Sequence, residues 1–162
     1  MRIRNANIQD ISAIHDVYTA AKRFMREHGN PTQWDSNYPS DELLLSDIDQ
    51  NSLFVIESDD TIHAVFALLP GPDPTYSYIE GKWLSDSDYY VIHRVASDNT
   101  LHGVLPFVLS FAFNLTNSIR IDTHSDNTVM QHLLIKNGFT HCGTIYLLDG
   151  NPRLAYQKDI CT

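Results

Sequence analysis

The sequence predicts one domain, residues 1–162, of the mixed α/β class: a mixed β-sheet with helices on both faces. Three observations lead to this prediction. The chain has 162 residues, the length of one ordinary domain. Strand and helix patterns alternate through its middle, which indicates right-handed crossovers and parallel strands. Neighbouring strand patterns on either side indicate antiparallel hairpins. The predicted element order is β-α-α-β-β-β-α-β-α-β-β.

The first three elements follow from alternation, spacing and capping residues. Basic and apolar residues alternate from Arg2 to Ala6, which predicts a short first strand. Asn7 can cap a helix over residues 8–29, in which apolar residues recur at helical spacing: Ile8, Ile11, Ile14, Val17, Tyr18, Ala21 and Met25. Ser40 and the acidic residues after it predict a second helix up to Ile48, because these side chains suit a helix amino terminus.

A hairpin and an alternating second half follow. Residues 52–58 and 61–69 are strand-like and flank Asp59-Asp60, the two-residue spacing of a tight hairpin. A long polar loop begins at Pro70. The remaining predicted elements are a central strand (89–97), a helix (104–115), a strand (119–123), a helix (127–136) and two strands (139–147 and 153–157).

Composition narrows the class of protein. The net charge is −9, with 20 acidic and 11 basic residues, and no basic cluster interrupts it, so nucleic acid is not an expected partner. No apolar run approaches the roughly 20 residues that span a bilayer, so a membrane is not expected either. Two cysteines and the lack of a signal-peptide pattern predict a cytoplasmic protein. The sequence does not decide the oligomeric state, and a homodimer stays open.

The element order and three local sequences resemble the GNAT superfamily of acetyltransferases. Tyr90 to Ser97 is similar to the family's central strand, and Ile121 to Asp126 to the strand that leads into its last helix. Asn127 followed by Gly138-Phe139 is similar to the closing pattern, in which Asn opens a helix that ends in Gly-Phe. The resemblance implies an acetyl-CoA-dependent N-acetyltransferase with a splayed gap between strands 89–97 and 119–123.

The resemblance also implies the residues that would hold acetyl-CoA. They are main-chain groups of the central strand, the segment that follows it and the helix-opening Asn: Val95, Ala96, Thr100, Leu101, His102, Gly103, Val104, Leu105 and Asn127. Backbone amides at a helix start suit a pyrophosphate, and the family places glycines there so that the chain can approach it. This chain departs from that pattern, since Gly103 is the one glycine present.

Acetyl transfer to an amine needs a base, and the resemblance implies Asp122. It stands five residues before Asn127, where some relatives place a carboxylate. The alternative is a structural hydrogen bond or salt bridge with Arg120 or Arg153. His124 is a second candidate base, with a structural histidine as its alternative.

The acid that the family commonly uses is missing. Its position, seven residues after the helix-opening Asn, is occupied by Leu134. Tyr146 on the following strand is a substitute, and a packed strand tyrosine is the alternative. The sequence has no HExxH motif and no cysteine pair, so no metal is predicted.

Four residues are candidates for acceptor binding. Trp34 and Tyr38 lie in the loop between the first two helices, Glu80 in the loop before the central strand, and His93 in that strand. Aromatic rings with a carboxylate suit a small-molecule amine, although loop aromatics also fold back onto a core. A non-catalytic relative that binds a ligand or partner is the alternative to the enzyme, because the helix tyrosine and most glycines are missing.

Overall fold

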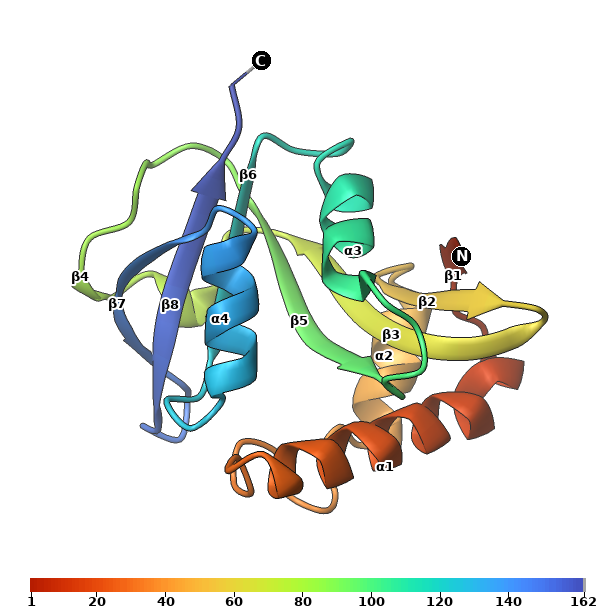
Figure 1. Ribbon diagram of the computed structural model, residues 1–162. Coiled ribbons are helices and arrows are strands. Elements are labelled where there is room, and N and C mark those ends of the chain that lie inside the picture. Colours follow the sequence, from red (N-terminus) through yellow and green to blue (C-terminus); the bar gives the residue numbers. More distant parts are fainter. Residues whose placement is uncertain (162) are drawn as a thin grey trace. The chain divides into compact units, whose positions relative to one another are not determined.

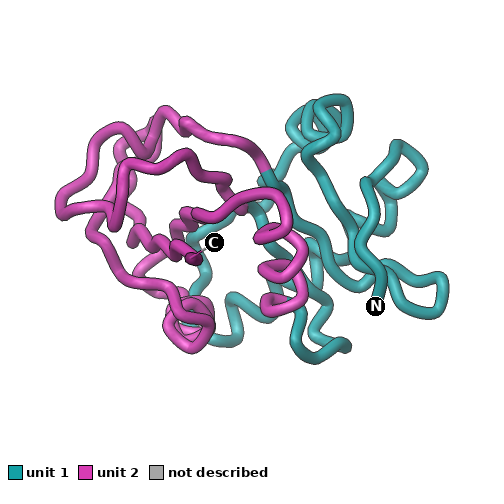
Figure 2. The backbone as a smooth tube through the Cα atoms, turned by 90° about the horizontal axis from the view of Figure 1, so that it is seen from above, with its two compact units in different colours: residues 1–68, 93–104 teal, residues 69–92, 105–162 magenta. Residues whose placement is uncertain are grey.

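The computed structural model describes residues 1–161, and these form two compact units, coloured separately in Figure 2. One unit contains residues 1–68 and 93–104, and the other begins at residue 69, with residues 69–92 and 105 onward. The strands follow the order β1-β2-β3-β5-β6-β8-β7-β4 in one mixed sheet, and four α-helices accompany them in the described part. This confirms the predicted fold class. The single domain stays a prediction.

The first unit is built from the amino-terminal elements (Figure 1). Its elements are β1 (Arg2–Asn5), α1 (Ile11–Glu27), α2 (Asp41–Asp49), β2 (Leu53–Ser58), most of β3 (Thr61–Pro70) and the second half of β5 (Tyr90–Ser97). β2 pairs antiparallel with β1 and with β3. Asp59 and Asp60 both have positive φ, 52° and 60°, as a type I′ turn requires, so the predicted hairpin is confirmed.

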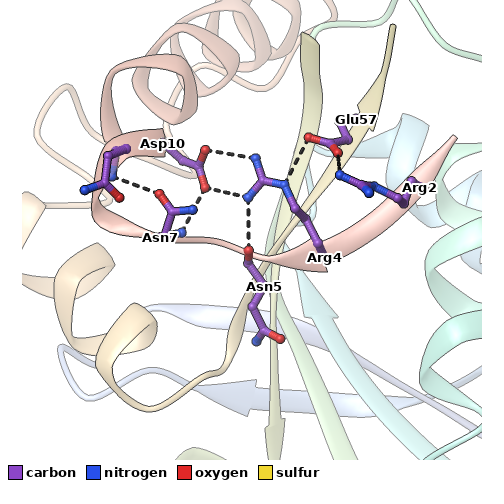
Figure 3. A network of polar contacts seen from close by, with 7 residues as sticks. Arg2, Arg4, Asn5, Asn7, Asp10 and Glu57 are labelled. Carbon is purple, nitrogen blue, oxygen red and sulfur yellow. Dashed lines mark hydrogen bonds and ion pairs between the residues drawn. The ribbon is translucent and has the colours of Figure 1, made fainter. Parts of the chain in front are cut away.

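An arginine ties β1 to the start of α1 (Figure 3). The Arg4 guanidinium donates to both carboxylate oxygens of Asp10, at 2.7 and 3.0 Å, and to Glu57 at 3.0 Å. Asp10 in turn accepts the backbone N–H of Asn7, whose side chain accepts the N–H of Gln9. Asn7 therefore caps as predicted, although Ile8–Asp10 (η1) form a 3-10 turn before α1 begins.

The second unit holds the carboxyl-terminal elements (Figure 1). They are η2 (Pro74–Tyr76), β4 (Glu80–Gly81), the start of β5, most of α3 (Val104–Ala112), β6 (Ser118–Thr123), α4 (Thr128–Lys136), β7 (Thr140–Tyr146) and β8 (Pro152–Asp159). β8 pairs antiparallel with β6 and β7. Fully buried residues from the sheet and from α4 form its core: Val91, Ile119, Leu134, Ile145 and Ala155.

The segment that was predicted to be a long polar loop contains two short elements instead. Besides η2, the strand β4 pairs antiparallel with β7, with Glu80 opposite Thr144 and Gly81 opposite Gly143. A Cβ on Gly81 would lie 2.2 Å from the Cys142 carbonyl oxygen, so only glycine allows this approach. A two-residue strand has no alternation that a sequence could reveal.

Two boundaries also differ from the sequence prediction. The helix predicted to reach Leu115 ends at Ala112, because Asn114 and Leu115 instead donate to carbonyls three residues back. The last strand is longer than predicted, from Pro152 to Asp159. Within residues 1–161, no helix combines the length and the apolar character that crossing a membrane requires.

Candidate active site

A left-handed residue interrupts β5 in the first unit. Arg94 has φ +55°, which is uncommon for a non-glycine residue inside a strand and is typical of a β-bulge. Its guanidinium donates to Asp47 at 2.6 Å, and these side chains are only 10% and 5% exposed. Its carbonyl accepts the Tyr18 hydroxyl at 2.8 Å. Arg94 is therefore held through both its side chain and its backbone, directly before Val95 and Ala96.

The segment after β5 leads into α3 and contains most of the residues predicted to hold acetyl-CoA. Gly103 has φ +72° and no atom within 4 Å of where a Cβ would lie, so its backbone faces open space. Leu105 is buried, 5% exposed, which leaves its backbone rather than its side chain for a ligand. Pro106 stands in the first turn of α3, where a missing N–H costs little. An exposed glycine before a helix amino terminus fits a phosphate group.

The predicted acceptor aromatics lie together in the first unit. The Trp34 ring centroid is 6.1 Å from that of Tyr38 and 5.6 Å from that of buried Tyr18. Tyr38 also hydrogen-bonds Arg94. Both loop rings are half-buried, so they pack on the core and still expose an edge. His93, also half-buried, precedes Arg94 in β5.

A cavity of about 270 Å³ adjoins this loop. It is lined mostly by polar residues of α1, of the loop and of the start of α2: His15, Tyr18, Thr19, Lys22, Ser36, Asn37, Pro39, Ser40 and Asp41. His15 lies 2.5 Å from Asp41, and Lys22 donates to the Ser36 carbonyl at 3.3 Å. Partial burial lowers the pKa of Lys22. The cavity has both acidic and basic groups at its wall.

In the second unit, Asp122 is held by a tyrosine that the sequence did not indicate. The Tyr76 hydroxyl donates to Asp122 Oδ2 at 2.6 Å. Burial, and secondly the charge of Asp122, raise the pKa of Tyr76 well above its usual value. Of the two arginines in the structural alternative, Arg120 instead lies 4.0 Å from the ring centroids of both Trp83 and Tyr89. Tyr76 is 46 positions away in sequence, so only the fold reveals this pair.

Glu80 and Tyr146 meet in the second unit. Glu80 pairs opposite Thr144, and Tyr146 is two residues further along β7, so both side chains lie on one face of the sheet. The hydrogen bond to Glu80 is the main reason that the pKa of the Tyr146 phenol is raised. From the sequence, Glu80 is a candidate for acceptor binding and Tyr146 a candidate acid, with no connection between them. Only the unforeseen strand β4 joins them.

His124 and Asn127 are both fixed by the turn before α4. Asn127 Oδ1 accepts the backbone N–H of Met130 at 3.1 Å, which confirms it as the helix cap. His124 Nδ1 accepts the backbone N–H of Asp126 at 2.9 Å. The neutral ring therefore carries its proton on Nε2, and that atom suits a hydrogen-bond donor better than a base.

Comparison with known proteins decides the family. No family model and no curated protein matches the chain. The structure of a GNAT-family acetyltransferase from Streptococcus agalactiae is 32% identical, with a TM-score of 0.88 over 99% of this chain and 96% of that one. The chain belongs to the GNAT family of acetyltransferases. The predicted family and enzyme class, an acyltransferase of the GNAT type, are confirmed.

More distant solved structures share the fold of this GNAT chain. An acetyltransferase of the family from Listeria monocytogenes is 19% identical, with a TM-score of 0.71 over 98% of this chain and 94% of that one. A ribosomal-protein-alanine N-acetyltransferase from Brucella melitensis is 17% identical, with a TM-score of 0.62 over 99% and 100%. At these identities the likeness concerns the fold alone.

The residues of this GNAT chain divide between the two units. Trp34, Tyr38, His93 and the segment from Val95 to Val104 belong to the first unit, and Glu80, Asp122, His124, Asn127 and Tyr146 to the second. Leu134, in the position of the common acid, is fully buried in α4. Within residues 1–161, no three His, Cys, Asp or Glu side chains cluster as metal ligands. The absence of a metal stays a prediction.

Proposed function

We propose that this chain transfers the acetyl group of acetyl-CoA to a primary amine of a small molecule. The observation that carries the proposal is the 32% identity to an acetyltransferase over 99% of the chain. A match of that extent, with a TM-score of 0.88, covers every element discussed above. Cytoplasmic location remains a prediction of the sequence, and the oligomeric state stays open.

The residues fit a donor that carries a pyrophosphate. When bound, acetyl-CoA supplies an acetyl group activated as a thioester. The open backbone at Gly103 and the amides that lead into α3 would hold its phosphates. Main-chain groups of Val95 and Ala96, directly after the left-handed Arg94, would hold the remainder, since β5 pairs with β6 at Tyr90 and Val91, before these residues. Asn127, as the cap of α4, would keep that helix terminus in place.

An amine acceptor requires a group that takes a proton, and two carboxylates are suited to it. Asp122 keeps its Oδ1 for an incoming N–H, because the Tyr76 hydroxyl is bonded to Oδ2. Glu80 is exposed on β4 beside Tyr146 and can bind an ammonium group. The net charge of −9 also favours a cationic acceptor over an anionic one.

A proton donor is available although the common helix tyrosine is Leu134. Tyr146 keeps its proton at neutral pH, since Glu80 raises its pKa above the usual value near 10. Its hydroxyl is therefore a donor and not a phenolate, and its proton, which is donated to Glu80 in this structure, would be turned to the leaving thiolate. His124 Nε2–H is a second donor, because Nδ1 is occupied by the Asp126 amide.

A small acceptor is supported by the cavity beside Trp34 and Tyr38. Its volume of about 270 Å³ lies just below the usual range for small-ligand pockets, which begins near 300 Å³. A cavity of this size suits a low-molecular-weight amine.

The second candidate function is non-catalytic binding of a ligand by a GNAT fold. Two observations favour it: Leu134 in place of the tyrosine, and a single glycine before α3. The two functions differ in turnover. Wild-type protein is incubated with acetyl-CoA and a panel of small primary amines, and release of the CoA thiol is followed over time. Alcohols with the same carbon skeletons are the matched controls.

The expected result is thiol release with at least one amine and none with its matched alcohol. Thermal unfolding in the same buffers adds an independent readout, since acetyl-CoA at 100 times its Kd raises the free energy of unfolding by about 2.7 kcal/mol. Stabilisation without any amine-dependent release would favour the non-catalytic function. If acetyl-CoA neither stabilises the protein nor releases its thiol, the proposed enzyme is contradicted and a non-catalytic protein that binds another ligand or partner is favoured.

A further inference from the structure

A histidine on β3 contacts the segment that follows β5, and all of its contacts lie within the first unit. His63 Nδ1 is 2.8 Å from Asp98 Oδ2 and 2.9 Å from Thr100 Oγ1. Thr100 Oγ1 donates to Asp98 Oδ1 at 2.6 Å. The two residues are also joined through their backbones, because the Asp98 N–H donates to the His63 carbonyl at 2.9 Å. We call His63, Asp98 and Thr100 the loop triangle.

The protons of the loop triangle are determined by its contacts. The Thr100 hydroxyl proton goes to Asp98, and an ionised carboxylate only accepts. His63 Nδ1 must therefore carry a hydrogen and donate it. Partial burial favours the protonated acid, but the Thr100 hydroxyl, the Thr100 amide and His63 outweigh it and lower the pKa of Asp98. The carboxylate is thus an anion with three donors around it at neutral pH.

The triangle sits at the start of the segment proposed to bind the phosphates of CoA. Thr100 belongs to that segment, and Gly103 is its one glycine. Asn99, between the two loop members of the triangle, has φ +65° without being glycine. The segment is therefore shaped by side-chain hydrogen bonds at the positions where glycine is absent. A loop that is ordered before the ligand arrives loses less conformational entropy on binding.

We propose that His63 is a positioning residue for CoA binding: it holds Asp98 and Thr100 so that the backbone of residues 100–104 is ordered for phosphate. The inference rests on the proposed function and adds to it, because His63 has no role in the family motif. The His63 side chain is 19% exposed and that of Asp98 23%, so this pair is partly shielded from water, whereas Thr100 is exposed. His63 acts on the ligand only through the loop.

The first test is calorimetric titration of CoA into wild type, His63→Leu and His63→Asn. Leu removes the donor, and the Asn side-chain N–H replaces Nδ1–H at nearly the same place. We expect a Kd about tenfold higher for His63→Leu and within about threefold of wild type for His63→Asn, as expected for one hydrogen bond to a charged group. His141→Leu, an exposed histidine of the other unit, is the control and should bind as wild type does.

Kinetics separate positioning from a general structural role. At a saturating amine concentration, His63→Leu should keep its kcat within about twofold while KM for acetyl-CoA rises about tenfold, because the variant binds the ground state and the transition state more weakly by the same factor. A His63→Asn variant as weak as His63→Leu would overturn the proposal. So would a drop in kcat at unchanged KM.

For Asp98→Ala, the loop triangle and a simple charge effect predict opposite changes in the affinity for CoA. If Asp98 were only a negative charge near a phosphate site, its removal would tighten CoA binding. The loop triangle predicts weaker binding, by about three- to tenfold, because the loop loses its acceptor. Tighter or unchanged binding overturns the inference. This variant also decides the matter if His63→Leu, which lies in a strand, fails to fold.

These experiments distinguish a failure of the proposed function from a failure of the role proposed for His63. If wild type shows no heat of CoA binding, the proposed function fails and the inference with it. If wild type binds CoA and both His63→Leu and Asp98→Ala bind equally well, only the role of His63 is wrong.

Discussion

The Tyr76 hydroxyl donates to Asp122 Oδ2 across 2.6 Å, and the donor ring is only 2% exposed. A buried tyrosine at this distance fixes the direction of the carboxylate. One oxygen is thereby bonded, and the other stays available on a half-buried side chain at the end of β6. This arrangement is compatible with a base that has a fixed orientation, and equally with a structural carboxylate. Substitution of either residue separates the two roles.

Asp122→Asn should lower kcat by a factor of about 100 or more, the usual contribution of a general base. The amide keeps an oxygen for the Tyr76 hydroxyl, so the fold should survive. Steady-state kinetics with the best amine, together with a thermal melt, checks this. Unchanged kcat with an unchanged pH–rate profile would mean that Asp122 is structural.

Tyr76→Phe keeps the ring and removes the donor. Loss of a hydrogen bond to a charged group should lower the free energy of unfolding by about 1–2 kcal/mol. Asp122 keeps its charge, so kcat should fall much less than in Asp122→Asn. Urea denaturation at neutral pH and kinetics on the same preparation give both values. A Tyr76→Phe variant as inactive as Asp122→Asn would make the tyrosine part of the reaction itself.

The pKa of Tyr76 also predicts a loss of stability at alkaline pH. Burial raises the folded-state pKa well above 10.0, whereas the unfolded chain releases the same proton near pH 10. Above pH 10 the unfolded state binds fewer protons than the folded state, so the free energy of unfolding falls as pH rises towards the folded pKa. Denaturation at pH 8 and at about pH 10.5 should show a smaller fall for Tyr76→Phe than for wild type. Equal falls would exclude Tyr76 as a cause.

The sequence predicted those interactions of the site whose two partners are close together along the chain, and missed those whose partners are far apart. Asn7, Ser40 and Asn127 cap helices as predicted, because each bonds an amide two or three residues away. The Asp59-Asp60 turn was predictable for the same local reason. The Tyr76–Asp122 bond joins positions 46 apart, and nothing in the neighbourhood of Asp122 indicates its donor.

β4 shows the second limit of sequence prediction. A strand of two residues carries no periodic pattern, so Glu80 and Tyr146 were assigned different roles and no connection. The one sequence feature related to the pairing of β4 with β7 is a pair of glycines, Gly81 and Gly143, which allow the two backbones to approach closely. In the sequence, either glycine by itself indicates only a turn.

Gly143→Ala should damage this strand pair. Its Cβ would lie 2.1 Å from the Glu80 carbonyl oxygen, a backbone atom that cannot rotate away. We expect the free energy of unfolding to fall by about 2 kcal/mol or more, and the Glu80–Tyr146 hydrogen bond to weaken, because β4 must shift. Gly150→Ala is the matched control. It has φ +86° but nothing within 4 Å, so it should cost only the backbone strain of about 1 kcal/mol.

Arg4 should matter for stability where Arg2 does not. Arg4 is 29% exposed and bonds Asp10 and Glu57, whereas Arg2, which also pairs with Glu57, is 72% exposed. Arg4→Met should destabilise by about 1–3 kcal/mol, and Arg2→Met by less than about 0.5 kcal/mol. Equal effects in urea denaturation would contradict the network of Figure 3.

Acid pH should remove the contribution of the Arg4–Asp10 pair to the free energy of unfolding. The pKa of Asp10 is lowered, mainly by its hydrogen bond with Arg4, so the contribution is present above the unfolded value of about 3.8 and is lost as pH falls through the folded pKa. Wild type and Arg4→Met should therefore approach each other in stability as the pH falls below 3.8 and passes through the folded-state pKa of Asp10. A gap that stays constant over this acid range would locate the effect of Arg4 elsewhere.

The central claim is acetyl transfer to an amine, and its product tests it most directly. Purified wild type is incubated with acetyl-CoA carrying an isotope label in the acetyl group and with the panel of small primary amines, and the mixture is analysed by mass spectrometry. We predict a labelled N-acetyl amine that forms with wild type, forms far more slowly with Asp122→Asn and is absent without protein. Wild type that binds CoA and yields no labelled amide from any amine would contradict the claim.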